Sequence, residues 1–95
     1  MITEVAIFMA AAGKEDELGV GIRRGLTIIH QQAGCISATV TRCIEQPERY
    51  MLRVEWVSLE AHTVDFRSGP LFPQWRSNIA GLFAGTPEVF HYQTL

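Results

Sequence analysis

A histidine and an arginine, residue types that often take part in catalysis, border the apolar faces of two expected helical segments in this sequence. On a helical wheel for residues 59–67, His62 lies about 40° from Phe66, at the edge of the apolar face. Arg76 borders the apolar face of the helical segment that follows. An imidazole can act as a general base and a guanidinium can stabilise a developing anion, so both could serve a cavity between helices and a sheet. Alternatively, His62 bonds Asp65 or a backbone carbonyl, and Arg76 lies in a surface ion pair or at the rim of a dimer.

The expected last strand adds His91 and Tyr92, which are consecutive and therefore point to opposite faces of a sheet. One of them faces the helices and the other faces a partner, and the sequence does not decide which. Either could be a base or a hydrogen-bond anchor, and His91 is the alternative to His62 as the base. The residues expected to bind substrate in the same cavity are the aromatic Trp56, Phe66, Phe72 and Trp75 together with His91. The two tryptophans could instead be ordinary core residues.

No cofactor or metal motif accompanies these residues. The three histidines fall in different expected elements, without the spacing to one another or to a cysteine that metal sites use. Gly19, Gly21 and Gly25 lie inside a helical pattern and not in a phosphate-binding loop, and no Gly-x-Ser-x-Gly motif is present. An enzyme with this sequence is expected to work without metal, flavin or nucleotide cofactor.

The composition predicts one globular domain over residues 1–95. Splitting 95 residues in two would leave each half too small to sustain a core, and 47% apolar with 19% charged residues is typical of a globular protein. Eight basic against ten acidic residues leave a net charge of −2, which argues against nucleic acid and anionic membranes as partners.

The positions of the two cysteines indicate the cellular compartment in which the protein is expected to reside. Cys35 and Cys43 lie in one expected strand, about 26 Å apart at the rise of an extended chain, so they cannot form a disulfide with each other. Unpaired cysteines fit a reducing compartment, and no segment has the 18 or so apolar residues of a membrane span. A soluble cytoplasmic protein is therefore expected.

Hydrophobic periodicity and turn residues divide the chain into strands and helices. The expected elements are a strand at 2–10, a helix at 15–33, a hairpin of strands at 35–44 and 49–57, a helix at 59–67, a helical segment at 71–83 and a strand at 88–94. This βαββαβ order predicts a ferredoxin-like α+β fold, a split βαβ with a four-stranded antiparallel sheet and its helices on one face.

The first strand is apolar on both faces. Val5 and Ile7 lie on one side, and Ala6 and Phe8 lie on the other. Because the helices cover only one face of such a sheet, something else must cover the second face, and a second copy of the chain is the simplest cover. A homodimer packed sheet to sheet is expected.

Several segments carry a resemblance to a known family. LRVEW at 52–56, SLEAH at 58–62, DFRSGPLFPQWR at 65–76 and PEVFHY at 87–92 resemble the antibiotic biosynthesis monooxygenase family, as do GKEDEL at 13–18 and AGC at 33–35. The resemblance implies a dimeric α+β barrel and small oxygenases that act on polyketide phenols or quinols without metal or flavin. Haem-degrading relatives pair an Asn on the first strand with a His in the second helical region. Here the first strand has no Asn and the helical segment after Pro70 has no His, which disfavours that branch.

The sequence thus predicts a cofactor-independent monooxygenase acting on a small aromatic, phenolic or quinol-like substrate, with dioxygen as co-substrate. The catalytic candidates are His62, Arg76 and Tyr92, inside a dry aromatic cage. The alternative is a non-catalytic dimeric module that binds a small apolar metabolite, and haem binding or degradation ranks below both.

Overall fold

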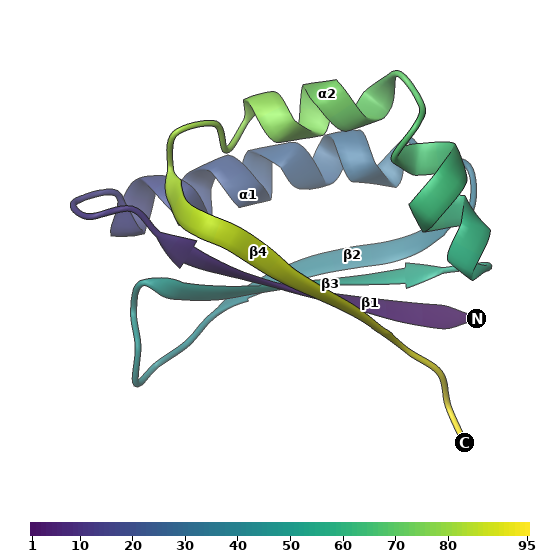
Figure 1. Cartoon of the computed structure of the whole chain (residues 1–95), viewed down its shortest axis with the longest axis horizontal. Helices are drawn as coiled ribbons and strands as arrows, with labels where there is room; N and C mark the ends of the chain where they lie inside the picture. The colour runs from purple at the N-terminus through teal and green to yellow at the C-terminus, as the bar shows by residue number, and fades with distance from the viewer.

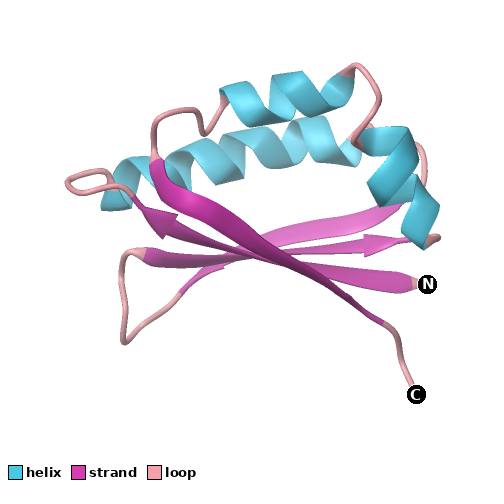
Figure 2. Cartoon of the chain, viewed as in Figure 1, coloured by secondary structure: helices cyan, strands magenta, loops and turns pink.

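The computed structural model describes all residues 1–95 and has two layers, a sheet and a set of helices on one of its faces (Figure 1). The elements in order are β1 (Ile2–Ala10), α1 (Glu15–His30), β2 (Cys35–Arg42), β3 (Arg49–Trp56), the π-helix η1 (Ala61–Phe66), α2 (Leu71–Ser77) and β4 (Phe83–Tyr92). The sheet is antiparallel with strand order β2-β3-β1-β4. All helices lie on one face and leave the other face bare (Figure 2), which confirms the expected ferredoxin-like fold.

Strand β1 runs through the middle of the sheet, paired with β3 on one side and β4 on the other. Glu4, Ala6 and Phe8 are buried on the face that the helices cover. The alternate residues, Val5 and Ile7 among them, lie on the bare face and are only partly buried. The two-faced pattern of this strand is therefore real, and its apolar side chains on the bare face have no cover within the chain.

Helix α1 packs its apolar face against the sheet and α2. Leu18, Ile22 and Ile29 are at most 1% exposed, and Gly25 lies against the Trp75 ring of α2. A Cβ at position 25 would lie 2.5 Å from a carbon of that ring, so glycine is required for the close approach of the two helices despite its cost in helix propensity.

The segment between β3 and α2 contains the π-helix η1, which is wider than a regular α-helix. Ser58 accepts a hydrogen bond from the Ala61 N–H at its side-chain oxygen, as expected of an N-cap. Within η1 the Arg67 N–H donates to the His62 carbonyl five residues back, at 3.1 Å. The chain turns at residues 67–70, and α2 follows.

The C-terminal part differs from the sequence prediction. Helix α2 ends at Ser77, not near Phe83, and β4 begins at Phe83, not at 88. For β4 the difference arises because Gly85 and Pro87, whose types indicate a turn, lie inside the strand at an irregularity of its pairing with β1. Gly85 has φ +70°, and proline is tolerated because β4 is an edge strand.

The core lies between α1, α2 and the covered face of the sheet. Only two polar or charged residues are buried with it, Glu4 at 5% exposed and His62 at 3%. Both cysteines are free. No helix combines the length and apolarity that crossing a membrane requires.

Candidate active site

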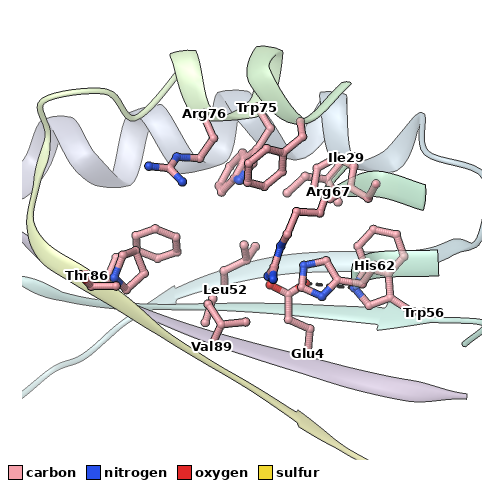
Figure 3. Close-up of a pocket in the computed structure, with 15 residues that line it drawn as sticks. Glu4, Ile29, Leu52, Trp56, His62, Arg67, Trp75, Arg76, Thr86 and Val89 are labelled. Carbon is pink, nitrogen blue, oxygen red and sulfur yellow. Dashed lines mark hydrogen bonds and ion pairs between the residues drawn. The ribbon is translucent and has the colours of Figure 1, made fainter. Parts of the chain in front are cut away.

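A cavity of about 360 Å³ lies between the helices and the covered face of the sheet (Figure 3). Its aromatic walls are Phe8, Trp56, Phe66, Phe72 and Trp75. Its polar lining consists of Glu4, His62, Arg67, Arg76 and Thr86. A space of this size, mostly apolar with a few converging polar groups, is typical of a small-molecule site.

The His62 imidazole is held on three sides. Its Nδ1 lies 2.7 Å from His91 Nε2, and its Nε2 lies 3.4 Å from Glu4 Oε1. Its ring stacks on Trp56 with centroids 5.2 Å apart and planes inclined by 17°. The three contacting residues belong to three different strands, so the sheet fixes the orientation of the imidazole that the π-helix supplies.

Charge and burial keep both imidazoles neutral. Burial lowers the pKa of His62 to about 4, helped by the positive charge of Arg67 and by His91. Burial also lowers the pKa of His91, again with help from Arg67. At neutral pH the pair is therefore a hydrogen-bonded couple of uncharged rings.

Glu4 is the functional candidate that the sequence prediction missed. Its Oε1 accepts a hydrogen bond from the Trp56 indole N–H at 3.0 Å. Burial raises the pKa of Glu4, and this outweighs the Trp56 hydrogen bond and the charge of Arg67, which both lower it. The alternation of the first strand held the signal, because it places a carboxylate in line with Ala6 and Phe8 on the covered face.

Two guanidinium groups reach the cavity. Arg67 extends from the helix layer toward Glu4 and His62, and Arg76 extends from α2 (Figure 3). The guanidinium carbon of Arg76 lies 5.8 Å from the Phe72 ring centroid and 5.6 Å from that of Phe83. Neither arginine has a carboxylate within ion-pair distance, so both charges remain open to a ligand.

The structure brings most of the predicted residues together. The predicted residues that line the cavity are His62, Arg76, Trp56, Phe66, Phe72 and Trp75. His91 does not line it and lies behind His62. The Asp65 bond considered for His62 is not formed, because His62 bonds His91, and the surface ion pair considered for Arg76 is not formed within the chain.

The expectation for Tyr92 is wrong in its placement. The register pairs His91 with Glu4 and Tyr92 with Thr3, so His91 faces the helices and Tyr92 faces the bare side of the sheet. Tyr92 is 55% exposed and contributes nothing to the cavity of its own chain.

Two contacts connect the titratable side chains of the site, one between Glu4 and His62 and one between His62 and His91. No group of three or more His, Cys, Asp or Glu side chains is arranged to hold a metal ion. The arrangement is suited to accepting, holding and returning a proton beside an apolar ligand.

Known proteins resemble the chain in sequence and in fold. The sequence profile of the antibiotic biosynthesis monooxygenase family matches residues 1–78. YczJ of Bacillus subtilis (strain 168), an uncharacterised protein, is 31% identical over 93 residues, which are 98% of each chain.

Solved structures share the fold over nearly the whole chain. A Bordetella bronchiseptica protein named as a candidate antibiotic biosynthesis monooxygenase has a TM-score of 0.92 at 33% identity, over 99% of this chain and 96% of its own. A mutant of SnoaB, a cofactor-independent oxygenase from Streptomyces nogalater, has a TM-score of 0.80 at 19% identity, over 98% and 91%. The second likeness shows the fold alone. The family match and the Bordetella bronchiseptica structure support a general monooxygenase-like role. The chain belongs to the antibiotic biosynthesis monooxygenase family.

Proposed function

We propose that the chain is a cofactor-independent monooxygenase acting on a small aromatic, phenolic or quinol-like substrate. The observation that carries the proposal is the aromatic cavity whose only buried polar residues are Glu4 and His62. A phenolic ring fits between aromatic walls, and its hydroxyl group can reach the polar end. Family membership and the cofactor-independent oxygenase among the structures of like fold support the same reading.

The chemistry needs three contributions from the protein. The Glu4–His62 pair takes the phenolic proton, and Arg67 and Arg76 stabilise the anion that forms. The electron-rich phenolate then reduces dioxygen by one electron, and the caged radical pair recombines to a peroxide at the carbon para to the oxygen. Where the para carbon carries a hydrogen, as in an anthrone, the peroxide takes the proton back and loses water. For an anthrone, the CH₂ group and one O₂ become a carbonyl group and one H₂O.

The walls of the cavity keep the radical pair together. Trp56, Phe66, Phe72 and Trp75 are proposed as the substrate-binding residues, because their rings surround the space and exclude water. The Phe66 and Phe72 rings meet edge to face with centroids 5.4 Å apart. His91 supports the polar end from behind His62 and is not proposed to touch the substrate.

The proposed functional unit is a homodimer packed through the bare face of the sheet. Met51, Phe90 and Tyr92 are 41%, 56% and 55% exposed on that face, next to Val5 and Ile7 of β1. Exposed apolar side chains of this kind are typical of a protein interface, and the charged Arg53 and Glu88 lie among them on the same face. The free cysteines are consistent with the cytoplasm as the proposed compartment.

Oxygen uptake with a panel of anthrones and hydroquinones tests the proposal. With an anthrone under ¹⁸O₂, we expect one ¹⁸O atom in the quinone product and one in water, at a rate well above that of the same anthrone without protein. Arg76→Gln is the variant to compare, because it leaves the walls of the cavity intact. Binding of the panel without any oxygen uptake would overturn the monooxygenase and leave the small-molecule-binding module in its place.

A further inference from the structure

We propose that Glu4 is the catalytic proton acceptor of this site and that His62 and His91 are positioning residues that fix its carboxylate. The inference rests on the proposed function, because it requires a substrate O–H in the cavity. It assigns the role of general base to Glu4, a residue on the covered face of β1 that the sequence analysis did not select.

The two carboxylate oxygens of Glu4 have different surroundings. Oε1 accepts the Trp56 N–H at 3.0 Å and lies 3.4 Å from His62 Nε2. Oε2 accepts no hydrogen bond from the chain, and yet no fully buried side-chain nitrogen or oxygen lacks a partner. Oε2 therefore keeps accessible surface, and the space that Glu4 lines is the cavity. One oxygen is held by the protein, and the other is free for a ligand.

The nitrogens of His62 are both engaged. Nδ1 is hydrogen-bonded to His91 at 2.7 Å, and Nε2 lies 3.4 Å from Glu4 Oε1 in an electrostatic contact that is not a hydrogen bond. An ionised Glu4 favours a proton on His62 Nε2, and Nδ1 must then accept from His91 Nε2–H, so His62 in this form has no lone pair free to take a proton from a ligand. The N–H groups of the two neutral rings are thus directed toward Oε1, which leaves the acceptor role to Oε2.

The charges around Glu4 suit a base that works near neutral pH. Trp56 from β3, His62 from η1, Arg67 after η1 and His91 from β4 all face this group. On β2, the pKa of the Cys35 thiol is raised by its own burial and by the negative charge of Glu4. Burial raises the pKa of Glu4 toward the working range of a general base, while Arg67 and the Trp56 N–H stabilise its ionised form.

The step itself is a single proton transfer. The substrate O–H bond breaks, an O–H bond forms at Glu4 Oε2, and the electron pair stays on the substrate oxygen as phenolate. His62 and His91 keep their protons on Nε2 throughout. Protonation of the peroxide later returns the proton from Oε2, so the carboxylate is regenerated at the end of the cycle.

The test uses 4-nitrophenol, whose phenolate absorbs visible light, at a pH one unit below its own pKa. Binding to the wild-type protein should produce phenolate absorbance without release of a proton to the buffer, measured with a pH indicator. Glu4→Gln should bind the probe either as neutral phenol or with one proton released for each phenolate formed. Glu55→Gln is the matched control on the neighbouring strand, where the carboxylate bonds Thr3 away from the cavity, and it should behave as wild type.

The outcomes separate this inference from the proposed function. Failure of the probe to bind wild type would overturn the proposed phenol site, and this inference with it. Binding with one proton released per phenolate in wild type, or with identical proton counts in wild type and Glu4→Gln, would overturn the role of Glu4 alone.

The positioning role has its own readouts. In ¹⁵N-histidine spectra at pH 6, His62 should be neutral and protonated at Nε2, and His91 should have the same form at pH 8. His91→Ala should lower the phenolate fraction of the bound probe several-fold, and His91→Gln should restore it, because a glutamine amide can still donate to His62 Nδ1. A proton on His62 Nδ1 at pH 6, or equal phenolate fractions in both variants, would overturn this arrangement of N–H groups.

Discussion

Acidification should destabilise the fold through His62. The pKa of this imidazole is about 4 in the folded chain, against about 6.5 when it is free in water. Between these values the unfolded chain binds a proton that the folded chain excludes, so the free energy of unfolding falls as the pH is lowered from above 6.5 toward 4. The effect applies in full because the His62 side chain is only 4% exposed.

The size of the effect follows from the two pKa values. The whole interval corresponds to about 3 kcal/mol, and about 2 kcal/mol of this is already lost at pH 5 relative to pH 8. His91 acts in the same direction, since its pKa is also lowered. Glu4 acts in the opposite direction, because its pKa is raised and its protonation in acid relieves the cost of burying a charge.

Urea unfolding followed by tryptophan fluorescence at pH 8, 7, 6 and 5 measures the loss. His62→Gln keeps an amide that can donate and accept at the same place but does not titrate, so its stability should fall by about 2 kcal/mol less than that of wild type between pH 8 and 5. Phe66→Leu, which removes an aromatic ring from the same cluster, should lower stability equally at every pH. The chain concentration is held constant, since the stability of a dimer depends on it.

Parallel curves for wild type and His62→Gln would refute the reasoning. They would mean that His62 takes up its proton in the folded chain at nearly the same pH as in the unfolded chain. The neutral imidazole pair beside Glu4 would then be incorrect as well.

Three further predictions concern packing, charge and assembly. Gly25→Ala should lower the free energy of unfolding by about 1–2 kcal/mol, because the added methyl group meets Trp75, while the exposed Val20→Ala should change it by less than about 0.5 kcal/mol in urea titrations. A Gly25→Ala protein as stable as wild type would contradict this. Arg76→Gln should slow anthrone oxidation about 10-fold or more in an oxygen electrode, since a positive charge near the developing anion is lost, and an unchanged rate would remove Arg76 from the site. Phe90→Glu should give the mass of one chain in sedimentation equilibrium at micromolar concentration where wild type gives two; equal masses would contradict packing through the bare face of the sheet.

The sequence predicted the structure correctly where the hydrophobic periodicity of a segment matches the burial of its side chains. The alternation of β1 and the apolar face of α1 predicted the element order, the fold and a sheet with one bare face. The cavity residues from 62 to 76 followed from helix periodicity, because His62 and Arg76 border faces that had to be buried. Those predictions depend on local geometry, which a short stretch of sequence determines.

The failures depend on pairing across the sheet. Tyr92 and His91 alternate, but only the register of β4 against Thr3 and Glu4 decides which of them faces the helices. Gly85 and Pro87 have the composition of a turn, and only their pairing with β1 identifies an irregular edge strand. Glu4 was passed over because a single charge in a strand is usually solvated, and its burial depends on Trp56 and His62, each more than fifty residues away in sequence.

The extra residue in the π-helix determines which charges share the cavity. In a regular α-helix, residues five apart are rotated by about 140° and point in different directions. In η1 the Arg67 N–H bonds the His62 carbonyl, and both side chains line the same space. If the same five-residue spacing were wound as a regular α-helix, the guanidinium would turn away from the imidazole without a change in either residue. The π-helical winding of this segment therefore determines the chemistry of the cavity, and a relative in which the same spacing forms a regular α-helix need not share an activity even where its aromatic walls are identical.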